Sequence, residues 1–269
     1  MRSKPSRFHA PIFALILLLL LGGCAPQEAA PEEVIVFAAA SLTDAMSEIA
    51  RSFEAVNPGT TVALNFGSSS QLAAQLVEGA PADVFASANP AQMQVVVDSG
   101  RVEGEEPLLF ATNRLTAIVP ADNPAGIESL GDLAQPGIAL VLAVPGVPVR
   151  DYTDEALGRL AADPAYGPAF ADGFYANLVS EEDTVRLVAA KVALGEADAG
   201  VVYTSDVTPD IADRVIQIAI PDAYNVIASY PIAPLSDAPN PAGASAFVDY
   251  VMGGEGQAIL GRWGFGAKP

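Results

Sequence analysis

Histidine and cysteine, which supply much of the nucleophilic and metal chemistry in proteins, are almost absent from this sequence. Of its 269 residues, one is a histidine, His9, and one is a cysteine, Cys24. The chain beyond Cys24 can therefore form no Ser-His-Asp or Cys-His pair, no disulfide, and no imidazole or thiolate metal site. We expect a protein that is not an enzyme and that carries no cofactor.

Basic residues are also scarce. The sequence has 13 lysines and arginines against 32 aspartates and glutamates, for a formal net charge of −19. Three basic residues and no acidic ones precede Cys24, so the chain after it carries 10 basic and 32 acidic residues, a charge of −22. A nucleic-acid-binding protein needs clustered Lys and Arg, so that class is excluded. Charge repulsion is largely screened beyond about 8 Å, and a local anion site therefore remains compatible with this composition.

The apolar run at residues 12–21 is too short to span a membrane. It has about ten residues, whereas a helix that crosses a bilayer needs about 20. Three basic residues, Arg2, Lys4 and Arg7, precede it. A basic start followed by a short apolar run is typical of a secretory signal peptide.

The run ends in LGGC at residues 21–24, which resembles the lipobox of bacterial lipoproteins. This resemblance implies that residues 1–23 are removed and that Cys24 is lipidated, which would anchor an extracytoplasmic protein to the membrane. The alternative is an ordinary signal peptide with an incidental cysteine. Residues 24–32 are rich in Pro, Ala and Glu and predict a disordered tether.

Strands and helices are predicted to alternate along the rest of the chain. Continuous apolar runs with many β-branched residues are typical of buried parallel strands, and 3.6-residue apolar spacing is typical of helices. The predicted strands are 34–38, 62–66, 83–87, 115–119, 138–144, 199–203 and 216–220, and the predicted helices are 43–53, a segment around 72–76, 152–160, 181–194 and 242–260. This alternation predicts an α/β protein with a mostly parallel sheet.

Two serine sites occupy equivalent positions in this pattern. Ser41 and the serines at 68–70 each follow a buried strand and open a helix. Ligands of open parallel sheets bind beyond the carboxyl ends of the strands, where helix N-termini offer unpaired N–H groups to an anion. The alternative is plain helix capping by serine. A nucleophilic role would need a base, and with no histidine only Lys191 and Lys268 could supply a lysine.

Two further positions remain open on the residues alone. The acidic residues at 181–183 are expected to lie in the first turn of a helix, where they would complement its dipole, and a hard cation site is the other interpretation. Tyr203 ends an apolar strand and would by itself be a half-buried core tyrosine with a solvated hydroxyl.

Taken together, several long stretches resemble the molybdate-binding proteins of ABC transporters. They are VFAAASLTDAMSEIARSFE, FGSSSQLAAQLVEGAPADVFASA, VPVRDYTDEAL, DTVRLVAAKVALGEADAGVVYTSD and a closing GFG. The resemblance runs from about residue 34 to residue 265. It implies a two-lobed periplasmic-binding-protein fold of type II that holds an oxyanion between its lobes. It also implies delivery of that oxyanion to the membrane subunits of an ABC permease.

The resemblance implies five residues that bind molybdate: Ser41, Ser69, Val149, Val185 and Tyr203. Ser41 and Ser69 would donate through hydroxyl and backbone N–H, Val149 and Val185 through backbone N–H, and Tyr203 through its hydroxyl. The sequence departs from the family at Arg150, where a glycine is usual. Either the backbone turn differs there, or Arg150 enters the cleft as an extra charge.

We expect one lobe to consist of residues 33–112 and 229–269 and the other of residues 113–228, in a monomer. Molybdate is fully deprotonated near neutral pH and needs only hydrogen-bond donors, which fits neutral Ser, Tyr and N–H groups. Tungstate is almost the same size and is expected to bind as well. The alternatives are the same fold with sulfate or a small organic acid, a serine hydrolase with a base other than histidine, and an adaptor lipoprotein without a small ligand.

Overall fold

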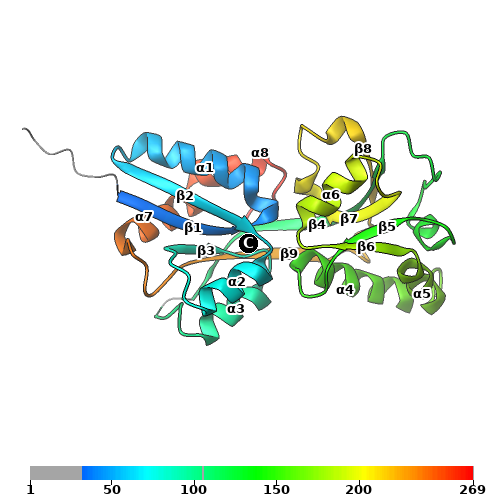
Figure 1. The fold of residues 1–269 in the computed structure, drawn as a ribbon, viewed down its shortest axis with the longest axis horizontal. Coiled ribbons are helices and arrows are strands. Elements are labelled where there is room, and N and C mark those ends of the chain that lie inside the picture. The colour runs from blue at the N-terminus through cyan, green and yellow to red at the C-terminus, as the bar shows by residue number, and fades with distance from the viewer. Residues whose placement is uncertain (1–31, 105, 269) are drawn as a thin grey trace, which may run out of the picture. The chain divides into compact units, whose positions relative to one another are not determined.

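The computed structural model describes residues 32–104 and 106–268 (Figure 1). The predicted signal peptide, Cys24 and the tether up to residue 31 lie outside the described residues. The remainder, from Glu32 onward, forms one unit with a continuous set of contacts.

The first group of strands is built around β1. This strand pairs in parallel with β2 and β3, and β3 pairs antiparallel with β9. The bounds are β1 Glu32–Ala39, β2 Thr60–Gly67, β3 Val84–Ala86 and β9 Ile227–Pro234. Helices α1, α7 and α8 cover one face of this group and α2 and α3 the other (Figure 1). These helices are α1 Thr43–Val56, α2 Ser69–Val77, α3 Pro90–Asp98, α7 Pro241–Met252 and α8 Gly254–Arg262.

The second group is built around β5, which pairs in parallel with β6 and β7. The bounds are β5 Leu140–Ala143, β6 Leu178–Glu182, β7 Ala199–Tyr203 and β8 Val215–Ala219. The helices of this part are α4 Pro148–Ala162, α5 Pro168–Ala176 and α6 Val185–Ala193. Helix α6 packs on β5 and β7 from one side, and α4 packs on the same strands and against α5 (Figure 1).

Strand β4 (Leu108–Pro120) belongs to both groups. Its first half pairs antiparallel with β9, and its second half pairs antiparallel with β7 and β8. The strand order is β2-β1-β3-β9-β4-β7-β5-β6, with β8 attached to β4. The sheet is therefore mixed rather than mostly parallel. The predicted lobe boundaries fall inside β4 and β9, and they stay a prediction.

Apolar spacing explains how α1 attaches to the sheet. Its buried residues Met46, Ile49 and Phe53 lie on one face, and the Phe53 ring meets Phe247 of α7 edge-on with centroids 5.3 Å apart. Such aromatic pairs stabilise by about 0.5–1.5 kcal/mol beyond the area that they bury. Helix α1 ends before Gly59, whose φ of +93° suits a residue without a side chain.

The predicted helix at 181–194 is wrong in its first turn. Glu181 and Glu182 are the last residues of strand β6, and α6 begins at Val185 with the Thr184 side chain accepting from the Leu187 N–H. Both glutamates pair with cations instead of a helix dipole, because Arg150 and Lys191 lie beside the strand. The acidic residues therefore form no first turn.

Two other predicted helices differ in their bounds. The helix predicted at 152–160 begins at Pro148, whose fixed φ suits the first helical position. The segment 242–260 is two helices, α7 and α8, separated at Gly253, where ψ is 172°. The earlier start of α4 matters for the site because it places Val149 in the first turn.

Candidate functional site

The five residues expected to bind ligand all lie where a strand ends. Ser41 follows β1 in the short turn η1 (Ala40–Leu42), and Ser69 follows β2. Val149 follows β5, Val185 follows β6, and Tyr203 is the last residue of β7. These are the carboxyl ends of parallel strands, the edge at which open α/β sheets bind ligands.

The structure brings all five residues together around one small cavity. The wall comprises Ala39, Ala40, Ser41, Ser68, Ser69, Ala88, Val147, Pro148, Val149, Val185 and Tyr203. About 10 Å³ is open to the centre of a water-sized sphere, which is close to the space that one water molecule requires. The wall is drawn from both groups of strands, and none of its residues is charged. A cavity of this size favours a compact ligand and excludes a sugar or a peptide.

Helix N-termini surround this cavity. Ser69 and Val185 are the first residues of α2 and α6, Val149 is the second residue of α4, and Ser41 lies in the turn that leads into α1. The first N–H groups of a helix have no partner within it and lie at the positive end of its dipole. The cavity therefore has the features of an anion site made of backbone.

The two serine hydroxyls are held by neutral partners. Ser69 Oγ accepts from the Ala88 N–H at 2.9 Å, so its own hydrogen is free for the cavity. Ser41 Oγ lies 3.0 Å from the hydroxyl of Tyr230. Neither partner can act as a general base near neutral pH, which argues against a serine hydrolase. Ser68 has the capping role instead, accepting from the Gln71 N–H at 3.3 Å.

The hydroxyl of Tyr203 lies buried without a hydrogen-bond partner among the described residues. The whole side chain is 1% exposed, and its ring meets Tyr152 and Tyr230 edge-on at 6.4 and 5.9 Å. Burial raises the pKa of Tyr203 well above 10.0, so the group stays protonated. A buried hydroxyl without a partner costs about 1–3 kcal/mol. Its place in the cavity wall makes it a donor prepared for a ligand.

Arg150 does not enter the cavity. Its guanidinium binds Asp154 at 2.8 Å and Glu181 at 2.6 Å, and it donates to the Ala143 carbonyl at 3.2 Å. It also lies 5.4 Å from the centre of the Tyr175 ring. Arg150 therefore joins α4 to β6 outside the cavity, whereas Val149 lies in the cavity wall.

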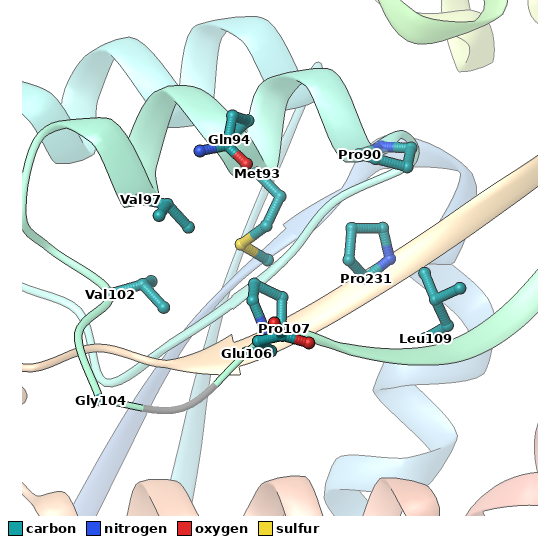
Figure 2. A pocket seen from close by; sticks show the side chains of 10 residues that line it. All are labelled: Pro90, Met93, Gln94, Val97, Val102, Gly104, Glu106, Pro107, Leu109 and Pro231. Atoms are coloured by element: carbon teal, nitrogen blue, oxygen red, sulfur yellow. The ribbon is translucent and has the colours of Figure 1, made fainter.

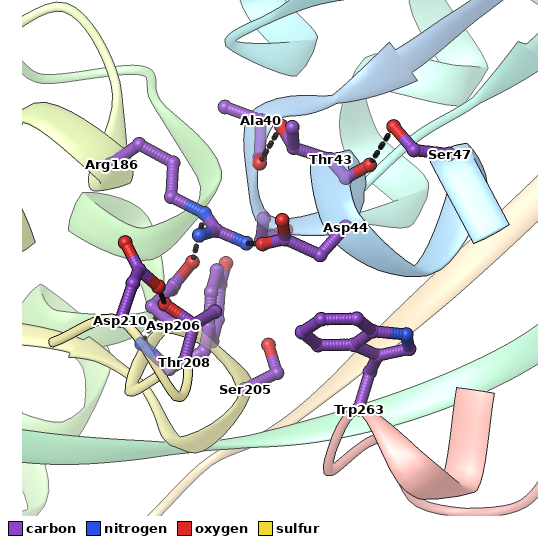
Figure 3. A network of polar contacts seen from close by, with 12 residues as sticks. Ala40, Thr43, Asp44, Ser47, Arg186, Ser205, Asp206, Thr208, Asp210 and Trp263 are labelled. Atoms are coloured by element: carbon purple, nitrogen blue, oxygen red, sulfur yellow. Dashed lines mark hydrogen bonds and ion pairs between the residues drawn. The ribbon is translucent and has the colours of Figure 1, made fainter. Parts of the chain in front are cut away.

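Arg186, the neighbour of Val185, joins α6 to two carboxylates (Figure 3). Its guanidinium binds Asp44 of α1 at 2.7 Å, and its Nε lies 3.2 Å from Asp206. Asp206 is fully buried, and its other oxygen accepts from the Tyr203 N–H at 3.1 Å. Burial raises the pKa of Asp206 to about 6, although Arg186 and the Tyr203 N–H act in the opposite direction. This network links α1, α6 and the end of β7 beside the cavity.

A much larger groove lies elsewhere, between α3 and the start of β4 (Figure 2). Its volume is about 540 Å³, and Met93, Val97, Val102 and Leu109 give it a mainly apolar wall. Glu106 is among its lining residues and would repel an anion. None of the predicted site residues lies there.

Two other features are absent from residues 32–104 and 106–268. No group of three or more His, Cys, Asp or Glu side chains is placed to hold a metal ion in that part of the chain. No helix among the same residues has the length and apolar character needed to cross a membrane.

Sequence reasoning missed several residues of this region. Ala88 follows β3 in the same strand-then-turn context as Ser41, so the pattern could have indicated it. Tyr230 of β9 and Asn113 of β4 lie behind Ser41, and no local signal pointed to them. Their side chains are 0% and 2% exposed, so they belong to the buried support of the site.

The chain belongs to the bacterial extracellular solute-binding protein family, whose model matches residues 34–266. Among its relatives is the molybdate-binding protein ModA of Mycobacterium tuberculosis, 43% identical over 236 residues that cover 88% of this chain and 85% of the relative. The putative ABC transporter substrate-binding lipoprotein YvgL of Bacillus subtilis is 28% identical and covers 96% and 97% of the two chains.

The periplasmic molybdate-binding protein of Azotobacter vinelandii shares the fold. It superposes with a TM-score of 0.75 at 21% identity, covering 88% of this chain and all of that one. The predicted fold class is thereby confirmed, and membership in a family of solute-binding proteins confirms that the chain is not an enzyme.

Proposed function

We propose that this protein captures molybdate in the small cavity and delivers it to an ABC permease. The observation that carries the proposal is the buried Tyr203 hydroxyl, which has no partner in the described part of the chain and lies in a cavity surrounded by helix N-termini and lined by uncharged residues. The identity of 43% with the molybdate-binding protein of M. tuberculosis supports the same ligand.

The available donors account for useful affinity. The hydroxyls of Ser41, Ser69 and Tyr203 and the N–H groups of Ser41, Ser69, Val149 and Val185 give about seven hydrogen bonds. At about 1.5–3 kcal/mol each, bonds to a charged group would total about 10–20 kcal/mol before desolvation and ordering oppose them. A net binding free energy of about −8 to −12 kcal/mol, micromolar to nanomolar, is then reasonable.

Selectivity follows from charge state and size. Hydrogen phosphate carries a proton that needs an acceptor, and a wall of donors offers none. Sulfate has the charge of molybdate but is smaller, so its hydrogen bonds to a wall fitted to molybdate would be longer and weaker. Tungstate has nearly the size and the charge of molybdate, and we infer that it binds with comparable affinity.

We also infer that ligand entry uses the two predicted lobes, 33–112 with 229–269 and 113–228. β4 and β9 run from one set of residues to the other, and they are the natural hinge. The cavity wall includes Ser41 and Ser69 from the first set and Val149, Val185 and Tyr203 from the second. Opening about the hinge would separate these walls, and bound oxyanion would favour the closed state.

The test is calorimetric titration of the purified protein with molybdate, tungstate, sulfate and phosphate in separate runs. One-to-one binding of molybdate and tungstate, with at least about hundredfold weaker binding of sulfate and phosphate, is expected. Absence of heat with molybdate, together with no thermal shift, would reject the proposed ligand.

Anchoring by a lipid on Cys24 is part of the proposal, supported by the LGGC sequence and by the lipoprotein relative YvgL. Cys24→Ser should move the protein from the membrane fraction to the soluble extracytoplasmic fraction. Retention of the Cys24→Ser protein in membranes would contradict a lipid anchor at this residue.

A further inference from the structure

Ser41 is joined to Tyr230, and Tyr230 to Asn113, by buried hydrogen bonds, and the groups around Asn113 fix which partner donates in each bond. Ser41 Oγ lies 3.0 Å from the Tyr230 hydroxyl, and Asn113 Nδ2 lies 3.4 Å from the same hydroxyl. Ser41, Tyr230 and Asn113 are 3%, 0% and 2% exposed, so bulk solvent does not reach these hydrogen bonds.

The orientation of the Asn113 amide is fixed by the backbone. Its oxygen accepts from the Arg114 N–H at 2.9 Å, and an N–H can only donate. The oxygen also accepts from the Thr204 hydroxyl at 3.1 Å. The amide NH₂ must therefore face the other side, where it donates to Ser205 at 2.7 Å and toward Tyr230.

The direction of the next bond follows from that orientation. Among the described residues, Ser41 Oγ is the one acceptor within hydrogen-bond distance of the Tyr230 hydroxyl, because its other neighbour at that distance, the Asn113 amide nitrogen, can only donate. The Tyr230 hydrogen therefore goes to Ser41. In the opposite arrangement Ser41 would donate to Tyr230, and the Tyr230 hydrogen would face an NH₂ group. A buried donor without an acceptor is costly, so the first arrangement is favoured.

Ser41 is thus left with one hydrogen and a single place to direct it, the cavity. The same holds for Ser69, whose oxygen already accepts from the Ala88 N–H at 2.9 Å. Both hydroxyls present hydrogen to the ligand, although a free serine hydroxyl can donate or accept.

We propose that Tyr230 and Asn113 are positioning residues that fix Ser41 as a donor and thereby select a fully deprotonated oxyanion over one that carries a proton. This inference rests on the proposed function, because it concerns the same cavity. It adds two residues outside the cavity wall that determine ligand selectivity without touching the ligand.

Chromate and hydrogen arsenate test this inference directly. At mildly alkaline pH both are dianions of closely similar size, but only arsenate carries a proton. Their affinities are measured by competition against molybdate in wild type and in Tyr230→Phe. The phenylalanine keeps the ring that packs edge-on against Phe265 at 5.4 Å. It removes the donor to Ser41 together with the acceptor of the longer, 3.4 Å bond from Asn113.

In wild type, chromate should bind more tightly than arsenate by at least about tenfold, the weight of one hydrogen bond to a charged group. In Tyr230→Phe that ratio should fall by about tenfold, because Ser41 becomes free to accept from the arsenate O–H. An unchanged ratio, including arsenate binding that stays undetectable in the variant, overturns the inference. So does a uniform weakening of both anions, which would indicate a structural role alone.

Asn113→Asp is the second variant, because it reverses the direction of donation along the hydrogen bonds from residue 113 to Ser41 with little change in side-chain shape. The carboxylate can accept from Arg114, Thr204 and Ser205 as well as from Tyr230, so Ser41 would then donate to Tyr230 and accept from the cavity. The ratio of chromate affinity to arsenate affinity should therefore fall further in Asn113→Asp than in Tyr230→Phe. A ratio equal to that of wild type overturns the inference. Failure of wild type to bind molybdate would reject the proposed function itself, whereas molybdate binding with unchanged ratios rejects only the role of Tyr230 and Asn113.

Discussion

Tyr203→Phe should affect binding and stability in opposite directions. The substitution removes one buried hydroxyl that has no hydrogen-bond partner among residues 32–104 and 106–268. It keeps the ring, which packs edge-on against Tyr152 and Tyr230 with centroids 6.4 and 5.9 Å away. The change therefore isolates the hydroxyl from the packing of the residue.

The expected magnitudes follow from this environment. A hydrogen bond from a neutral group to a charged ligand contributes about 1.5–3 kcal/mol, so molybdate affinity should fall about ten- to a hundredfold. Removal of an unsatisfied buried hydroxyl should leave the free energy of unfolding unchanged or raise it by up to about 3 kcal/mol. For a chain of this size each 1 kcal/mol raises Tm by about 2–4 °C.

Calorimetric titration and thermal melts without ligand measure the two effects. Tyr224→Phe is the matched control, because its hydroxyl donates to Asp163 at 2.7 Å, away from the cavity. That variant should bind molybdate as wild type does and should be no more stable. If Tyr203→Phe instead lowered Tm and left affinity unchanged, the hydroxyl would be a structural group, and the argument from its missing partner would fail.

Two further predictions concern the same region. Ser69→Ala should weaken molybdate binding at least about tenfold through the lost hydroxyl donor. Ser70→Ala is the control, because Ser70 lies just outside the cavity wall, and it should change the affinity less than about threefold. Equal losses of affinity in the two variants, measured by calorimetry, would refute the specific role of Ser69. Burial raises the pKa of Asp206 from 3.8 to about 6. Between pH 3.8 and pH 6 the native state therefore keeps a proton on Asp206 that the unfolded state has released. The free energy of unfolding consequently falls as pH rises through this range. In urea unfolding, the free energy of unfolding of Asp206→Asn relative to wild type should therefore rise by about 2 kcal/mol between pH 4 and pH 7. A difference that does not vary with pH would contradict the raised pKa.

The parts of the fold and site that depend on local pattern could be predicted from the sequence. Ser41 and Ser69 were found because each follows a buried strand and opens a helix, and this relation spans only a few residues. The family resemblance added Val149 and Val185, which contribute backbone alone and have no side-chain signal. The structure brings these residues together, but that they bind molybdate stays a prediction.

Other features depend on residues far apart in the chain. Tyr230 and Ser41 are 189 residues apart, so no local pattern could join them. Strand β9 was missed because Pro231 and Pro234 argue against a central strand. The sheet accommodates Pro231 by a shift of register between Leu109 and Ala111 on β4. Similarly, Glu181 was read as part of a helix because its partner, Arg150, is 31 residues away.

The convergence of helix N-termini on an uncharged cavity has a kinetic consequence. A dianion approaching a protein of net charge −19 is repelled at long range, and the attraction of the N–H groups acts only at contact. Added salt screens the repulsion but hardly reaches a buried cavity. Association should therefore become faster as ionic strength rises, while the dissociation rate stays nearly constant. Ligand capture would then be fastest at high ionic strength. Proteins that bind anions with Lys or Arg side chains show the opposite dependence.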